Sequence, residues 1–449
     1  MKAIVLDGSH ENDSTGERFH RVLTTELQSR GWEVEHFLLR NKKIGNCAGD
    51  FFCWIRTPGI CNVDDDNRDI AQSVANSDLM VYLTPIMFGG YSSTLKKMVD
   101  HQIQNVLPFF AQVENETYHQ KRYGKYPDFL AVGWMERPDM QAEAIFRQLT
   151  YRNALNFHAK RFATGVVLVG QTEGEMRASM QDWFNGMENG KMNEPAALPE
   201  FDKTNLRPGP IQRALLLVGS PRTRKSTSNS LGSYLFAGLG ARGIQSETIY
   251  IHTTLHSLER MKAMLEAIDA ADLVMLAFPL YVDSLPAPVT EALERIAANR
   301  ANSHLSHRQL FAAISNCGFP EADHNATALA ICENFARQAG FDWAGSLALG
   351  AGQGMVHGAP LDELDGRAIP LKKALDLAAE ALTQGLVIPE GAQALLAKPF
   401  IPGWLYRWMG TFGWKKQAKH YGAEKTLKRQ PYMKKENNDG QNIQWTLHS

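Results

Sequence analysis

The sequence has few cysteines and no excess of charge of one sign, and both deficits exclude classes of protein. Its 449 residues include 5 cysteines, which is too few for a secreted disulfide scaffold, and an odd number cannot all be paired. The 47 Lys and Arg residues balance 48 Asp and Glu residues, whereas a nucleic-acid-binding protein normally carries a basic excess. We therefore expect no nucleic-acid partner.

Long hydrophobic runs are also missing. The N-terminal apolar run, Ala3–Leu6, ends at Asp7 and is too short for a signal peptide. No stretch approaches the ~18 apolar residues of a transmembrane helix. The composition, 44% apolar and 21% charged, is that of a globular protein, and the length suggests about three domains. The sequence thus predicts a cytoplasmic protein of several domains.

Internal repetition organises the chain. An apolar strand followed by Gly8-Ser9 reappears before Gly219-Ser220, at an offset of 211 residues. Further on, Pro85 matches Pro279 at an offset of 194. The drop in offset indicates an extra loop in the first copy, and this loop holds Cys47, Cys53 and Cys61. We infer two copies of one fold, the first with a cysteine-bearing insertion.

Each copy alternates short apolar runs with longer amphipathic ones. Strands are predicted at 2–7, 33–39, 79–84, 129–133 and 164–169, then at 213–218, 246–251, 272–278, 308–315 and 344–349. Helices are predicted near 16–30, 67–76, 92–104, 139–157 and 174–187, then near 227–241, 257–269, 286–298, 323–339 and 369–385. Such alternation indicates parallel sheets covered on both faces.

The predicted fold class is therefore α/β: two doubly wound parallel five-stranded sheets of flavodoxin-like order, fused in tandem, with a C-terminal aromatic and basic tail. The predicted domains are 1–200 and 213–392, joined by a proline-rich linker at 201–212 and followed by the tail, 393–449. Ligands of such sheets bind outside the carboxyl ends of the strands, so the loops found there are the candidate sites.

The loop after the first strand of the second copy has the composition of an anion site. Gly219–Asn229 combines a glycine turn, a Ser/Thr run and three cations ahead of a helix N-terminus, which suits a phosphate. A capped helix with solvated charges is the alternative. The equivalent first-copy loop, Gly8–Gly16, keeps the small polar residues but carries Glu11 and Asp13 and no cation. Phosphate would bind there only if both acids turned to solvent, so electrostatics favours the second copy.

The loop after the third strand reverses that preference. In the first copy, Thr84–Lys96 offers a proline exit, a glycine pair and the aromatic faces of Phe88 and Tyr91, as a flat redox ring requires. The second copy, Phe278–Pro286, has no glycine but places Tyr281 close to the equivalent position. Because its ring loop matches in more positions, the first copy is favoured as the functional one, with the second next.

These two loops resemble those of the NADPH-dependent FMN reductases and their iron–sulfur flavoprotein relatives. Gly-Ser-Pro-Arg with a Ser/Thr/Asn run is similar to their FMN phosphate loop, and Thr84–Asp100 is similar to their isoalloxazine loop, with His101 where an Arg is common. The resemblance implies FMN at the sheet edge, hydride from NAD(P)H, and a dimer with flavins near its interface. Two fused copies can form that dimer as an intramolecular pseudo-dimer; a homodimer is the alternative.

The resemblance yields candidate cofactor-binding residues in both copies, with no catalytic side chain and no metal ligand assigned. They are Ser9, Ser14, Thr15, Pro85, Ile86, Met87, Phe88 and Gly89 in the first copy, and Ser220, Arg222, Lys225, Ser226, Thr227, Ser228, Pro279, Leu280, Tyr281, Asn316 and Gly318 in the second.

Three further segments have open interpretations. The segment Cys47–Cys61 looks like the relatives' four-cysteine segment, but Asp50 replaces the second cysteine. Structural thiols are favoured there over an iron–sulfur cluster or zinc. The aromatic insertion 105–127 either covers a flavin or forms an interface. The tail, with Trp404, Trp408, Phe412 and lysines up to Lys434 and Lys435, packs on the second domain or, less favoured, lies on a membrane surface.

The sequence supports three functions. The leading hypothesis is an FMN-dependent NAD(P)H oxidoreductase that passes electrons to a small acceptor such as a quinone or free flavin. The alternatives are a flavodoxin-type electron carrier for protein partners, against which the near-neutral charge counts, and a scaffold in which one or both flavin sites have degenerated.

Overall fold

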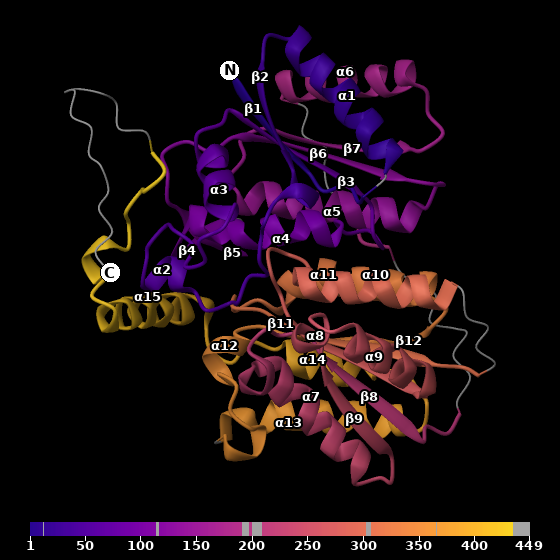
Figure 1. Ribbon diagram of the computed structural model, residues 1–449. Helices are drawn as coiled ribbons and strands as arrows, with labels where there is room; N and C mark the ends of the chain where they lie inside the picture. Colours follow the sequence, from indigo (N-terminus) through magenta and orange to yellow (C-terminus); the bar gives the residue numbers. More distant parts are fainter. Residues whose placement is uncertain are drawn as a thin grey trace.

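Two five-stranded parallel sheets frame the computed structural model, which describes residues 1–11, 13–113, 116–190, 197–199, 209–301, 307–364 and 366–433 (Figure 1). The first sheet has the order β2 (Glu33–Leu38), β1 (Lys2–Asp7), β3 (Leu79–Pro85), β6 (Asp128–Met135) and β7 (Phe162–Leu168). The second has the order β9 (Gln245–Tyr250), β8 (Arg213–Val218), β10 (Leu273–Pro279), β11 (Leu310–Asn316) and β12 (Asp342–Leu349). Both orders are the flavodoxin-like one, which confirms the predicted fold class.

Helices cover both faces of each sheet. The first sheet has α1 (Ser14–Ser29) and α6 (Glu173–Glu188) on its outer face and α3 (Asn67–Ala75), α4 (Ser93–His101) and α5 (Met140–Asn156) on its inner face. The second has α7 (Thr227–Gly240), α13 (Ile369–Thr383) and α14 (Glu390–Ala397) outside, and α9 (Leu258–Ala270), α10 (Ala287–Ala301) and α11 (Ala326–Gln338) inside. Short helices are α2 (Phe52–Ile55), α8 (Ile251–Thr254) and α12 (Gly352–Met355).

Each predicted strand and helix overlaps an observed one. The antiparallel hairpin of β4 (Val106–Val113) and β5 (Glu116–Lys121) was not predicted. It stands apart from both sheets and packs against α15 (Gly403–His420), a helix within the predicted tail. Within the described part of the chain, no helix is both long and apolar enough to span a bilayer. Most of the proposed linker, 201–208, and the lysines Lys434 and Lys435 lie outside the described residues.

The two copies face each other through their inner helices, with α4 and α5 against α10 and α11 (Figure 1). The buried residues of both inner faces form one continuous cluster. Phe88 of the first copy meets Phe335 of the second with ring centroids 5.1 Å apart. The chain thus contains an internal pseudo-dimer.

A reciprocal polar contact crosses this interface. Glu294 on α10 accepts hydrogen bonds from the backbone N–H of Ser93 (2.8 Å) and from its hydroxyl (2.6 Å), at the start of α4. Asp100 on α4 accepts one from the N–H of Ala287 (2.9 Å), at the start of α10. The two pairs are equivalent at the offset of 194. Each helix therefore supplies the carboxylate that satisfies the free N-terminal donors of the other.

Of the two carboxylates, Asp100 also pairs with a buried cation. It is buried beside Lys96, which forms an ion pair with it and donates a hydrogen bond to the backbone carbonyl of Tyr281 (2.8 Å) in the second copy. Burial raises the pKa of Asp100, and Lys96 opposes that rise.

We expect Asp100→Ala to lower the free energy of unfolding by about 3 to 5 kcal/mol, because it leaves Lys96 as a buried, unpaired charge. Urea unfolding followed by circular dichroism measures the loss. The matched control is Asp64→Ala, which removes an exposed partner of Arg68 and is expected to cost under about 1 kcal/mol. Equal losses in the two variants would contradict the role given to the interface pair.

Candidate functional site

A cavity of about 880 Å³ lies at the carboxyl edge of the second sheet. Four loops of the second copy line it: Arg222 after β8, Leu280–Asp283 after β10, Cys317–Pro320 after β11, and Ala351–Met355 after β12, apart from Gly352. This is the edge at which open α/β sheets bind ligands. The cavity is therefore the candidate site.

The first copy forms the opposite wall, through the two insertions that have no counterpart in the second copy. The cysteine loop contributes Cys47, Gly49, Asp50, Phe51 and Trp54, and the hairpin region contributes Ile103, Val106, Phe110 and His119. The aromatic insertion thus covers the cavity and forms an interface at once. Whether the segment covers a flavin stays a prediction.

Helix α15 closes the cavity on a third side. Trp414 contacts Phe51 and Trp54, each with ring centroids 5.3 Å apart. Gly410 lies so close to the hairpin that a Cβ atom there would approach Phe110 to 2.6 Å. The cavity wall on this side is consequently aromatic and tightly packed.

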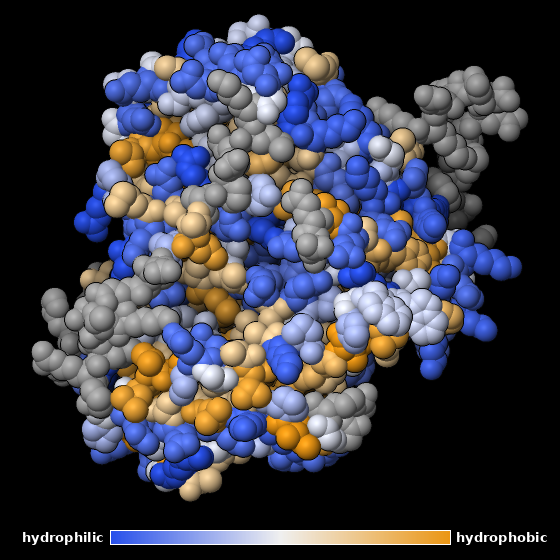
Figure 2. Space-filling view, turned by 180° about the vertical axis from the view of Figure 1, so that it is seen from behind, coloured by the Kyte–Doolittle hydropathy of each residue, from blue (hydrophilic) through white to orange (hydrophobic). Residues whose placement is uncertain are grey.

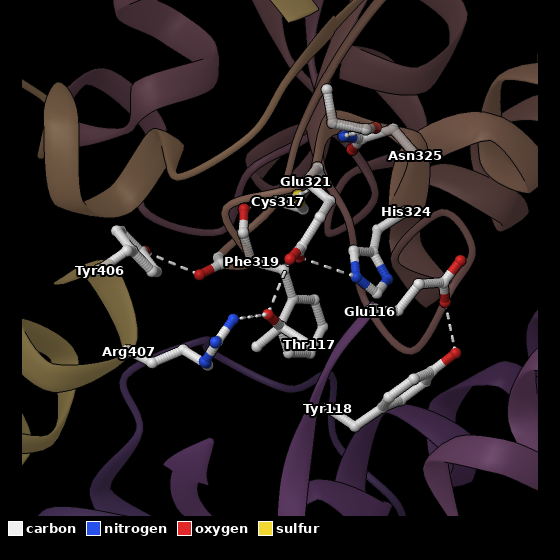
Figure 3. A network of polar contacts seen from close by, with 12 residues as sticks. Glu116, Thr117, Tyr118, Cys317, Phe319, Glu321, His324, Asn325, Tyr406 and Arg407 are labelled. Carbon is white, nitrogen blue, oxygen red and sulfur yellow. Dashed lines mark hydrogen bonds and ion pairs between the residues drawn. The ribbon is translucent and has the colours of Figure 1, made fainter. Parts of the chain in front are cut away.

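A polar network fixes hairpin, helix and loop to one another (Figure 3). The Thr117 hydroxyl donates to Glu321 (2.8 Å), and Arg407 on α15 donates to Thr117 (3.4 Å). The hydroxyl of Tyr406 donates to the carbonyl of Gly318 (2.7 Å) in the loop after β11. These bonds hold α15 in one rotational setting above the second sheet.

The phosphate loop of the second copy offers free donors and no acid. Ser226 caps α7 by accepting from the N–H of Asn229 (3.1 Å), and the other first-turn N–H groups have no partner within the helix. Asn316 donates to the Ser228 hydroxyl (2.9 Å), which leaves the Ser228 proton free to donate. Arg222 lines the cavity and is held by Gln353 (3.0 Å). The loop is arranged as an anion site.

The equivalent loop of the first copy is already satisfied by carboxylates. The buried Asp7 accepts from the Ser9 N–H (2.9 Å) and hydroxyl (2.5 Å), and its other oxygen lies 2.9 Å from His20 Nδ1. Asp13 caps α1 by accepting from the N–H of Gly16 (2.9 Å). Asp13 therefore faces the helix terminus, the arrangement that disfavours a phosphate.

The two ring loops also differ in their surroundings. In the first copy, Phe88 is buried against Phe335, and a Cβ on Gly89 would approach Ile145 to 2.7 Å. In the second copy, Leu280, Tyr281, Val282 and Asp283 line the cavity. The Tyr281 hydroxyl lies 1.9 Å from where a Cβ on Gly49 would stand, so only glycine lets the cysteine loop cover this ring loop.

The predicted cofactor-binding residues divide accordingly. Arg222, Leu280, Tyr281 and Gly318 line the cavity. The other second-copy candidates do not line it: Ser220, Lys225, Ser226, Thr227, Ser228, Pro279 and Asn316. Lining residues that were not among the candidates come from the aromatic insertion, the cysteine loop and α15, whose aromatic richness was the available signal, and from the second-copy segments Gln353–Met355 and Lys398–Ile401. The first-copy candidates, Ser9, Ser14, Thr15, Pro85, Ile86, Met87, Phe88 and Gly89, are not among the lining residues.

Four titratable groups of the cavity have pKa values shifted toward the neutral form. Burial raises the pKa of Cys47 and that of Cys317 to about 12, and it raises the pKa of Tyr281 well above its usual value. Burial lowers the pKa of His119 to about 4. The buried Nδ1 atom of His119 has no hydrogen-bond partner in the described part of the chain.

The cysteine loop packs as a structural element. Phe51 stacks on Trp54 at 5.2 Å, and Cys53 is buried with them. Cys61 Sγ lies 3.6 Å from His101 Nδ1. Among the described residues, no group of three or more His, Cys, Asp or Glu side chains is placed to hold a metal ion.

Comparisons with known proteins agree with the motifs. The family model described as NADPH-dependent FMN reductase matches residues 1–121 and 213–332, more than half of the chain. An iron-sulfur flavoprotein from Methanocaldococcus jannaschii is 28% identical over 100 residues, 22% of this chain and 51% of that protein. An FMN-dependent NADPH-azoreductase from Staphylococcus aureus is 29% identical over 101 residues, 22% of this chain and 52% of that protein. The chain thus spans about half the length of these curated relatives.

Solved structures with a similar fold match at lower identity. An NAD(P)H:quinone oxidoreductase from Methanothermobacter marburgensis is 15% identical with a TM-score of 0.28, over 39% of this chain and 96% of that one. An FMN-dependent NADH-azoreductase from Bacillus anthracis, in complex with FMN, is 13% identical with a TM-score of 0.30, over 38% of this chain and 99% of that one. The family match in two separate segments carries the conclusion: this chain belongs to the NADPH-dependent FMN reductase family, as a tandem of two of its domains.

Proposed function

We propose that the chain is an FMN-dependent NAD(P)H oxidoreductase with one working flavin site, formed by the second copy and covered by the first. The observation that carries the proposal is the cavity at the carboxyl edge of the second sheet, which is lined by the ring loop Leu280–Asp283 and by Arg222 of an acid-free loop. Family membership and the FMN and NADPH in the names of the relatives support it. This assignment reverses the preference for the first copy that the ring loops alone suggested.

The residues present fit FMN. The first N–H groups of α7, the Ser228 hydroxyl and the Arg222 guanidinium would hold the phosphate, and His357 and Lys398 add polar groups to the same cavity. The backbone of Leu280–Val282 would border the isoalloxazine ring. When bound there, FMN supplies hydride acceptance from NAD(P)H and electron transfer to an acceptor.

The protein contributes position and exclusion of water. Phe51, Trp54 and Phe110 form an apolar wall opposite the ring loop, and the Cys47 thiol and the Tyr281 hydroxyl there are neutral, while Asp50 and Asp283 also line the cavity. A flat, weakly polar acceptor suits such a wall better than a charged one. We therefore propose a small planar acceptor such as a quinone or a free flavin.

The first copy acts in this scheme as a cover rather than as a second site. A phosphate ~4 Å from the buried Asp7 would be repelled by about 4 kcal/mol per charge pair at an effective dielectric constant near 20. The residue equivalent to Asp7 at the offset of 211 is Val218, so the second loop has no carboxylate at that position. All five cysteines are free thiols, which fits the cytoplasm as the proposed location.

Purified protein saturated with FMN is expected to hold one flavin per chain. Arg222→Ala is expected to weaken FMN binding by about 10- to 100-fold, because it removes a charge-assisted hydrogen bond worth roughly 1.5 to 3 kcal/mol. Fluorescence titration measures the dissociation constant. The control Arg224→Ala removes the same charge from the same loop, at a residue that does not line the cavity, and should change the constant less than about threefold. Two flavins per chain, or equal effects of both variants, would contradict a single second-copy site.

The oxidoreductase and the electron carrier differ in what reduces them. We expect NADH or NADPH alone to bleach the bound flavin within seconds under anaerobic conditions, because an oxidoreductase takes hydride directly from the nicotinamide. Stopped-flow absorbance measures the rate. A flavin that bleaches with dithionite but not with either nicotinamide would favour the carrier.

A further inference from the structure

We infer that the exposed face of α15 docks on an anionic lipid membrane, next to the mouth of the cavity. The packed face of the helix fixes which side remains outside. Tyr406, Gly410 and Trp414 face the hairpin and the cavity, and Arg407 is tied to Gln112 (2.8 Å). The helix therefore cannot rotate to bury its opposite side without losing these contacts.

The opposite side carries a cluster of large apolar residues in solvent. Trp404, Trp408 and Phe412 recur at every fourth residue and are 66%, 59% and 61% exposed. The rings of Trp408 and Phe412 lie 4.9 Å apart. Other large exposed apolar residues, such as Met140 and Leu258, are isolated from one another along the chain. Figure 2 shows pale aromatic side chains on the right flank, where α15 lies, with apolar ones beside them. Such clustering marks an interaction surface, whereas single exposed residues do not.

The charge of this face selects the partner. The same helical stripe continues from the aromatic residues into Lys415, Lys416 and Lys419, and α15 contains no Asp or Glu. Lys425 and Lys428 follow. Tryptophan and phenylalanine beside a run of lysines suit the headgroup region of a bilayer that contains anionic lipid. A dimer formed by two α15 helices is disfavoured, because the α15 of a second copy has no carboxylate to pair with these lysines.

The position of the helix joins this surface to the cavity. Met409 lines the cavity and is also 51% exposed, so the cavity reaches solvent at the edge of the docking face. Ile401, Gly410 and Gly413 continue the lining along the helix. A molecule dissolved in the bilayer would meet the apolar wall of the cavity without first crossing water.

The position of the cavity beside the docking face indicates the class of acceptor, an inference that rests on the proposed function. The acceptor would be a lipid-soluble quinone. Its reduction to the quinol takes two electrons and two protons, of which NAD(P)H supplies a hydride and solvent supplies one proton. NAD(P)H leaves as NAD(P)⁺, so the reaction balances without a further reductant.

Vesicle co-sedimentation with the full chain tests the docking. We expect binding to vesicles of phosphatidylglycerol and phosphatidylcholine that weakens with salt, and little binding to phosphatidylcholine alone. The triple variant Trp404→Ser, Trp408→Ser, Phe412→Ser and the triple variant Lys415→Gln, Lys416→Gln, Lys419→Gln should each reduce binding roughly tenfold or more. The control Met140→Ser, Leu258→Ser removes exposed apolar residues elsewhere and should leave binding unchanged.

Other outcomes overturn the proposal. Equal binding by the aromatic variant and the control would do so, as would self-association of the full chain in analytical ultracentrifugation that the aromatic variant abolishes without any vesicle binding. Circular dichroism verifies that each variant is folded.

A paired activity assay separates this proposal from the proposed function. The aromatic variant should reduce a short-chain quinone in solution at the normal rate but lose at least about tenfold with a long-chain quinone in vesicles. Loss of neither activity would remove the membrane route. Absence of both activities in the unaltered protein would instead remove the oxidoreductase function and leave the vesicle result standing.

Discussion

The contact between α4 and α10 is the constraint on which the site depends. Each helix caps the free N–H groups of the other with a carboxylate, Asp100 or Glu294. The apolar residues around these carboxylates form one core. Buried carboxylates without such donors would be costly, so the two copies are fixed in one relative position. That position brings the insertions of the first copy over the carboxyl edge of the second sheet.

The two copies share a fold but not an environment. In the first, the donors after β1 are used by Asp7 and Asp13, and the ring loop is packed against α5 and α11. In the second, the corresponding strand ends in Val218 and the loops open into the cavity. A symmetric pair would cover both sites equally. Here the insertions belong to one copy only, so one site is enclosed and the other is filled.

Helix α15 links the enclosed site to the surface. Its inner residues close the cavity, and its outer residues place aromatic and basic groups in solvent. Packing of the tail on the domain and contact of the tail with a membrane were alternatives in sequence terms. The expected packing on the second domain was wrong in its main partner, because α15 packs chiefly on the hairpin and α2 of the first copy, while Trp404, Trp408 and Phe412 remain exposed.

The sequence by itself determined the duplicated α/β fold and the loops that could carry a phosphate and a ring, whereas the strand order was inferred from the number of units and became visible only in the structure. Apolar periodicity and the composition of a strand-tip loop are local properties, and they fix secondary structure and charge. It also marked Arg222, Leu280, Tyr281 and Gly318, which line the cavity. Only the tertiary structure decided which copy holds that cavity. Whether Asp13 faces a helix terminus, whether Phe88 meets Phe335, and whether Gly49 lies on Tyr281 depend on contacts between residues far apart in the chain, and no local pattern encodes the packing that joins them.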